Sequence, residues 1–296
     1  MRPCFVLALI LAGSQGAHCA RGHIRGPNPR QAIAAEKPPV DTNQESIGRF
    51  RISRPTVLAV AYRMQSIYGV DVWVATEKQT PWLQRLVALG PNIESRSSLG
   101  SGIEAVWYKV GEDLLIDAQK GKIWAHRGAP EGKEAGAEEL VRDVILSYRE
   151  GASNGFSIGP GAIVIEKSLS ETALLQMSNE TVEVEFSTQT VREPNTRKFM
   201  DVGEERDFAA LAGGSLTVLR ERERKIAGLK GRELHVRVTT PKTGEHTRYT
   251  WHFPGEPRSA SRPSVTLLAK TASAAAALEP IWESLLTSIQ CSPSER

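Results

Sequence analysis

The sequence predicts an α+β protein with two domains, each a mainly antiparallel sheet with one or two packed helices. Stretches in which apolar and polar residues alternate recur along the chain with turn residues between them, which is typical of antiparallel strands. Stretches with helical spacing are few and do not follow each strand in turn, as they would in a doubly wound sheet. With 296 residues, the chain is long enough for two domains of ordinary size.

The first domain is predicted over residues 43–152, and most of it alternates as strands. In one of these stretches Val70, Val72 and Val74 share one face, whereas Asp71 and Trp73 share the other. The stretches predicted to be strands are 48–55, 68–76, 103–110, 113–119 and 122–128.

Two helices are predicted in this domain. Residues 80–90 have a capping threonine and a proline at their start and a glycine at their end. Residues 137–150 form an amphipathic pattern in which Leu140, Val144 and Tyr148 lie four residues apart.

The second domain is predicted over residues 153–296 and has a similar organisation. Residues 215–240 read as a polar strand, a turn and a second strand. The domain closes with a helix over residues 273–289. The apolar stripe of that helix consists of Leu278, Ile281, Trp282, Leu285 and Ile289. The other predicted strands are 161–168, 174–178, 182–190, 248–255 and 264–271.

Residues 1–19 have the pattern of a secretory signal peptide. Arg2 provides the positive charge, an apolar run follows over residues 5–12, and small residues come next. The run is shorter than the roughly 20 residues of a membrane-spanning helix. We therefore expect export to the periplasm, with membrane association only if Cys19 carries a lipid. Residues 20–42, rich in proline and basic residues, are interpreted as a flexible linker.

The charge and the cysteines exclude several classes of site. Arg2 contributes +1 and residues 21–40 contribute +3 to the net charge of +3, so residues 41–296 carry −1, are near neutral and give no reason to expect a nucleic-acid partner. Removal of the leader takes away Cys4 and Cys19 and leaves Cys291 alone, so no disulfide is expected. Because the sequence has no C-x-x-C motif and no paired-histidine spacing, no metal site and no cofactor are predicted.

Residues 151–155, GASNG, fit the G-x-S-x-G pattern of serine hydrolases. In a nucleophile elbow the serine follows a strand and precedes a helix. Here a predicted helix precedes Ser153 and an extended segment follows it, so we interpret the glycines as a helix stop and a domain joint. No catalytic residue is predicted, although a hydrolase site without a recognisable motif stays an alternative.

Several motifs, taken in order along the chain, resemble those of a known family. The matching residues are Gly48, Arg49, Phe50, Pro55, Gly155, Phe156, Gly161, Arg222, Gly228, Gly231, Glu233, Trp251 and Trp282. With them the chain is similar to the periplasmic immunity proteins of type VI secretion lipase effectors, over nearly its whole exported length. Ser46 and Ser157 lie at or beside places where that family often carries cysteines, and Glu283 stands where an aspartate is usual.

The resemblance implies function without catalysis. Such a protein binds a cognate lipase effector, with its two domains closing on the effector as a clamp and blocking access of the lipid. Trp73, Trp107, Arg222 and Arg224 are the residues we predict to contact the partner, because tryptophan and arginine are common interface anchors. An adaptor that binds the effector without inhibiting it is the alternative from another class.

Overall fold

The computed structural model describes residues 42–75, 92–130, 132–165, 170–193, 202–272 and 275–291. All of them lie within one compact unit, residues 40–296. The helices are α2 (Glu134–Leu146), α3 (Val202–Leu211) and α4 (Ala275–Ser288). The strands are β1 (Thr42–Ile47), β2 (Phe50–Pro55), β3 (Ala59–Ile67), β4 (Val70–Val74), β5 (Ile93–Ser98), β6 (Glu104–Val110), β7 (Asp113–Lys120), β8 (Ile123–Ala129), β9 (Tyr148–Glu150), β10 (Phe156–Ile158), β11 (Gly161–Ile163), β12 (Glu171–Ser178), β13 (Val182–Gln189), β14 (Ser215–Ile226), β15 (Leu229–Thr240), β16 (Gly244–Phe253), β17 (Ser264–Thr271) and β18 (Gln290–Cys291).

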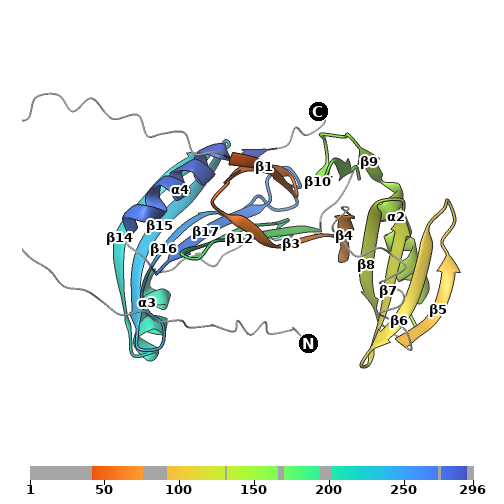
Figure 1. Ribbon diagram of the computed structural model, residues 1–296, viewed down its shortest axis with the longest axis horizontal. Coiled ribbons are helices and arrows are strands. Elements are labelled where there is room, and N and C mark those ends of the chain that lie inside the picture. Colours follow the sequence, from red (N-terminus) through yellow and green to blue (C-terminus); the bar gives the residue numbers. More distant parts are fainter. Residues whose placement is uncertain are drawn as a thin grey trace, which may run out of the picture. The chain divides into compact units, whose positions relative to one another are not determined.

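The main sheet has the strand order β14-β15-β16-β17-β13-β12-β3-β4-β8-β7-β6-β5 (Figure 1). Every pair of neighbours in it is antiparallel. Two three-stranded sheets, β1-β2-β18 and β10-β11-β9, accompany it. The α+β class predicted from the sequence is confirmed.

Strands from both predicted domains share hydrogen bonds. β3 pairs with β12 from Ile67 opposite Glu171 to Ala59 opposite Ser178, with a bulge between. β2 pairs with β18 at the end of the chain. The division of the chain at residue 152 stays a prediction, and the pairings show that β3 lies in the same sheet as β12 and that β2 lies in the same sheet as β18.

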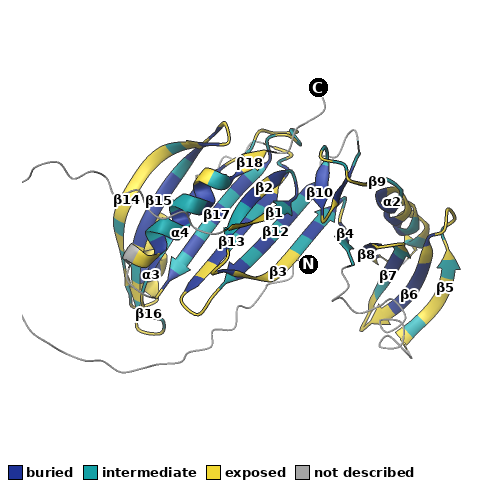
Figure 2. Cartoon of the chain, turned by 45° about the horizontal axis from the view of Figure 1, so that its top comes forward, coloured by how far each residue is buried: buried dark blue, intermediate teal, exposed yellow. Residues whose placement is uncertain are grey.

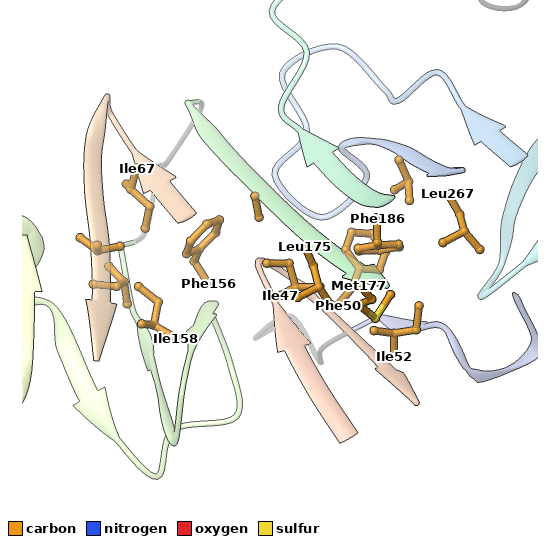
Figure 3. Close-up of a cluster of buried hydrophobic side chains, with 14 of the residues drawn as sticks. Ile47, Phe50, Ile52, Ile67, Phe156, Ile158, Leu175, Met177, Phe186 and Leu267 are labelled. Atoms are coloured by element: carbon orange, nitrogen blue, oxygen red, sulfur yellow. The ribbon is translucent and has the colours of Figure 1, made fainter. Parts of the chain in front are cut away.

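The hydrophobic core on which β12 and β13 pack lies between the main sheet and a layer formed by α4 and β1-β2-β18. Strands β12 and β13 alternate buried and partly exposed residues, as expected for one face packed on a core (Figure 2). Phe50 and Phe186 meet edge to face with their ring centroids 5.9 Å apart (Figure 3). Ile52, Trp282 and Leu285 belong to the same buried cluster and have no exposed surface.

Helix α2 covers one face of β4, β8, β7 and β6. Ala137, Val141, Val144 and Ile145 are its buried residues, and they recur at three- and four-residue spacing. Among the described residues, no helix is long and apolar enough to cross a membrane.

The structure corrects the predicted helix over residues 137–150. Helix α2 ends at Leu146, and Tyr148–Glu150 form β9, which pairs with β11. The hydroxyl of Ser147 donates to the carbonyl of Asp143 at the helix end, and the strand pairing then takes over the backbone groups of the next residues. Tyr148 therefore does not extend the helical stripe.

The remaining predictions of secondary structure have different outcomes. The strands predicted over 103–110, 113–119 and 122–128 match β6, β7 and β8 closely. β1, β3, β5 and α3 were not predicted. The signal peptide, almost all of the linker, and the helix over 80–90 lie outside the described residues.

Candidate partner-binding site

The four residues predicted to contact a partner lie in two separate regions of the main sheet. Trp73 is on β4 and Trp107 is on β6, whereas Arg222 and Arg224 are on β14, at the other end of the strand order. The structure therefore places Arg222 and Arg224 on one strand and does not form one continuous site from all four residues.

Trp73 and Trp107 are on opposite faces of their sheet. The registers through β8 and β7 place Trp73 on the face of Val106, because side chains alternate along each strand. Trp107 faces α2, is 6% exposed, and donates from Nε1 to Glu138 Oε1 at 2.9 Å. Trp73 is half-buried beside Trp124, with ring centroids 6.0 Å apart. Trp73 thus keeps more surface for a partner than Trp107.

A hydrogen-bonded polar cluster lies on the same face as Trp73. Asp117 has no exposed surface, and its Oδ1 accepts from Nδ1 of His126 at 2.7 Å and from the hydroxyl of Tyr108 at 3.1 Å. Burial raises the pKa of neighbouring Asp71. His126 is held by its contact with Asp117, and within the described residues no group of three metal-ligating side chains forms.

Ser153 lies in the segment between β9 and β10. A strand precedes it and a strand follows it, so the turn into a helix that a nucleophile elbow requires is missing at this position. The prediction that a helix directly precedes Ser153 and stops at these glycines was wrong, because α2 ends at Leu146 and β9 intervenes. The extended segment predicted after Ser153 is present as β10.

Arg222 and Arg224 form an ion-pair network around Glu233. Arg222 Nε lies 2.8 Å from Glu233 Oε2, and Arg224 Nη1 lies 3.3 Å from the same oxygen. Arg224 also makes a two-pronged contact with Glu283 on α4, at 2.8 and 2.6 Å. The side chain of Arg222 is 43% exposed and that of Arg224 is 18% exposed, so Arg222 offers the larger free surface.

Glu233 is the centre of this network and has no exposed surface. Besides the arginines, Nε1 of Trp282 donates to its Oε1 at 2.9 Å, and Nε2 of His235 lies 2.7 Å from the same oxygen. Burial by itself raises the pKa of the carboxyl, but hydrogen bonds with His235, Arg222 and Trp282 outweigh it and hold the pKa well below its ordinary value. Glu233 is thus a buried, paired carboxylate that joins β14, β15 and α4.

Aromatic rings surround this carboxylate. His235 stacks on Tyr249 with centroids 3.6 Å apart, and Trp282 meets both rings edge to face. Burial, together with Glu279, raises the pKa of Tyr249 to about 12. The rings exclude water from one side of the ion pairs, which strengthens the electrostatic interactions.

The spacing of Gly228, Gly231 and Glu233 follows from this packing. Gly228 has a φ of +83° in the two-residue turn between β14 and β15, a conformation that glycine adopts without strain. A Cβ on Gly231 would lie 2.6 Å from the indole of Trp251, so only glycine fits there. Two residues further, on the same face, Glu233 meets the arginines. The motif residues outside the turn therefore build the contact between sheet and α4.

Arg222 and Arg224 were predicted from the sequence as exposed contacts for a partner protein. Their buried partner within the chain, Glu233, was not predicted. The available signal was the alternation itself, because Arg222 and Arg224 share a face with Glu233 in a hairpin whose turn is fixed at Ala227 and Gly228. The register of that hairpin would have placed the charges opposite each other.

The fold is shared with solved immunity proteins. The chain is similar to a structure described as the Tle4–Tli4 complex, with a TM-score of 0.66 and 15% identity, over 85% of this chain and 98% of that one. It is also similar to the apo structure of immunity protein TplEi of the type VI secretion system from Pseudomonas aeruginosa, with a TM-score of 0.65, 18% identity, and 85% and 97% coverage. TplEi complexed with an "L" peptide gives a TM-score of 0.63 and 18% identity over 84% and 98%. Among curated proteins, none matches.

The second half of the chain matches a family model. Residues 152–293 match the model described as the C-terminal domain of Tle cognate immunity protein 4. The predicted resemblance to the immunity proteins of type VI lipase effectors is confirmed by this match and by the shared fold. The matched range contains Glu233, both arginines, Trp251 and Trp282.

Proposed function

We propose that the protein is a periplasmic immunity protein that binds and inhibits a cognate type VI secretion lipase effector. The observation that carries the proposal is the family match over residues 152–293. The fold shared with solved immunity proteins supports it over the rest of the chain. In this function the protein performs no chemistry, and inhibition follows from occupying the effector surface.

Inhibition by clamping is the mechanism that we propose. The effector is held between the part of the chain that carries Trp73 and the part that carries Arg222, and lipid access is blocked. The distribution of the predicted contact residues over both ends of the strand order supports this arrangement. A stable complex of this kind buries about 1,600 Å² in total.

The exposed fractions rank the four predicted contacts. Arg222 and Trp73 keep surface that a partner can reach, whereas Arg224 and Trp107 are largely committed to Glu283 and Glu138. We propose that the first two contact the effector directly and that the other two position the strands that carry them. Tryptophan and arginine are also the residue types that most often dominate binding energy.

The leader pattern over residues 1–19 supports delivery to the periplasm, where an effector that attacks membrane lipids would act. The same pattern leaves room for lipid attachment at Cys19. Mass spectrometry of the protein purified from its native envelope distinguishes a cleaved soluble chain from an acylated one by mass.

The proposal is tested by titrating the phospholipase activity of the product of the neighbouring gene with residues 21–296. Tight stoichiometric inhibition brings the activity to zero near one equivalent. Binding without loss of activity contradicts inhibition and identifies an adaptor. If no complex forms by calorimetry, the protein is not the immunity partner of that effector, and hydrolase activity of the chain itself should then be assayed.

A further inference from the structure

Helix α3 has an inner face that packs on the main sheet. Val202 contacts the small apolar cluster of Leu234 and Val236, and Ala209 is 7% exposed. Glu205 forms an ion pair with Arg248 of β16. Because Val236 and Arg248 alternate with His235 and Tyr249, α3 and α4 cover opposite faces of β14–β16 (Figure 1).

The outer face of α3 carries Glu204, Asp207, Phe208 and Leu211. These residues are spaced i, i+3, i+4 and i+7, which places them on one side of the helix. Phe208 is 71% exposed and Leu211 is 84% exposed, more than any other large hydrophobic residue among those described. An aromatic and an aliphatic side chain side by side in water contribute little to the fold of this chain.

The two carboxylates of this face are available for pairing. Within the described part of the chain, neither Glu204 nor Asp207 forms an ion pair, in contrast to inward-facing Glu205. The acidic group at the first turn favours the helix through its dipole. Asp207 lies beyond the first turn and directly beside Phe208, so the face combines apolar surface with unpaired negative charge.

We propose that this face, defined by Glu204, Asp207, Phe208 and Leu211, docks into an apolar groove with a basic rim on the cognate effector. The inference rests on the proposed function and names one of its contact surfaces. The residue spacing is that of helix-in-groove recognition, in which apolar anchors at i and i+3 enter the groove. Lysine or arginine at the rim of the groove pairs with the two carboxylates.

The negative charge of the α3 face favours the effector over a second copy of the chain or a membrane as its binding partner. A second copy of the chain in a two-fold contact sets this face against itself and brings four carboxylates together, which repel. An anionic membrane surface is disfavoured for the same reason, because its field attracts basic residues and not acidic ones. A different protein with basic residues around an apolar groove contacts the apolar side chains of this face and also pairs with its two carboxylates.

The test compares variants of the full exported chain in binding to the effector. Phe208→Ala and Asp207→Lys alter the proposed face. Val110→Ala and Glu112→Lys are matched controls at the exposed turn between β6 and β7, where Val110 is 56% exposed. All four positions are at the surface, so thermal unfolding should change little, and it is measured as a check on folding.

We expect Phe208→Ala to weaken the effector complex at least tenfold, as for a central interface anchor. Asp207→Lys should lower the association rate and weaken its dependence on salt, because the new lysine offsets the charge of Glu204. The control variants should bind within twofold of the wild type.

Normal affinity in both α3 variants, together with full inhibition by the wild type, overturns the inference and leaves the proposed function standing. Failure of the wild type to bind overturns both. A dimer that is lost only in Phe208→Ala, with effector affinity unchanged, shows that the face is a self-contact and also overturns the inference.

Discussion

At the scale of single residues, Glu233 combines complete burial with an ionised carboxyl. Its oxygens are contacted by side chains from β14, β15 and α4. A buried carboxylate is costly unless its hydrogen-bonding capacity is filled, and here four side chains fill it. The strength of the arrangement depends on having every partner present.

Replacing Glu233 with glutamine removes the charge and keeps the volume. Arg222 and Arg224 then face a neutral amide, and we expect a loss of roughly 2–4 kcal/mol in the free energy of unfolding. Glu223→Gln is the matched control, because Glu223 is 72% exposed and its ion pair, with Lys230 across the hairpin, lies at the surface. Its expected cost is below about 1 kcal/mol. Urea denaturation of the two variants measures the difference, and equal costs would refute the assigned role.

The same carboxyl predicts a dependence of stability on pH. The folded-state pKa of Glu233 lies below its ordinary value of 4.5, and that of Glu283 is lowered by its hydrogen bonds to Arg224. A lowered pKa stabilises the fold above pH 4.5, and this contribution is lost as the pH falls toward the folded-state pKa values. The stability difference between wild type and Glu233→Gln should therefore shrink from pH 6 to pH 3. A difference that stays constant over that range contradicts the linkage.

At the scale of elements, the β15 strand depends on the absence of a side chain at Gly231. A Cβ there would lie 2.6 Å from the Trp251 indole and 2.7 Å from the carbonyl oxygen of His252. Because the second atom belongs to the backbone, relief requires the strands to move apart. We expect Gly231→Ala to cost about 1–3 kcal/mol.

Gly136→Ala is the matched control for that substitution. Gly136 lies in α2, and a Cβ there meets nothing within 4 Å. Alanine is favoured over glycine in a helix interior by about 1 kcal/mol, so this variant should be more stable than the wild type. Thermal unfolding should show a loss of stability in Gly231→Ala and a gain in Gly136→Ala, as expected if packing at Gly231 causes the loss. A change of the same sign in both variants would contradict this explanation.

The elements that could be predicted from the sequence are those in which packing matches the pattern. β13 and β17 alternate clearly because one face of each lies on the core, whereas β6, β7 and β8 are apolar runs between turn residues and are buried over three or four consecutive residues. Residues 59–63 of β3 are exposed on both faces and form a strand through backbone pairing with β12. Their sequence therefore shows no alternation of apolar and polar residues. Helix α3 was missed because its large apolar residues point outward.

The candidate site was predictable only in part for a similar reason. Composition and motif spacing identified Arg222 and Arg224, but a strand that alternates arginine and glutamate looks solvated on both faces. Pairing with Glu233 depends on the hairpin register, and pairing with Glu283 depends on how α4 packs. The register follows from the two-residue turn at Ala227 and Gly228 and could have been derived from the sequence, whereas the packing of α4 is a long-range feature that local sequence does not encode.

At the scale of the whole molecule, strands that are far apart in the sequence are neighbours in the sheets. Strands β1, β2 and β3 come early in the sequence, yet β3 pairs with β12 and β2 pairs with β18. Phe50 and Ile52 have no exposed surface and pack in the same core as Phe186 and Trp282. Arg49, in the turn between β1 and β2, adds a two-pronged ion pair to Glu171 at the start of β12, at 2.7 and 2.6 Å.

This arrangement predicts that a fragment of residues 153–296 does not fold alone. Without residues 42–67 the fragment loses the pairing partner of β12 and at least two large core side chains, each worth about 2–5 kcal/mol. Net stabilities of domains are about 5–15 kcal/mol, so the loss is comparable with the whole. Residues 43–296 should unfold cooperatively by circular dichroism, whereas 153–296 should not, and a peptide of residues 42–67 should restore the transition. If 153–296 unfolds cooperatively at the temperature of the longer chain, residue 152 is a true domain boundary and β2 and β3 are dispensable additions.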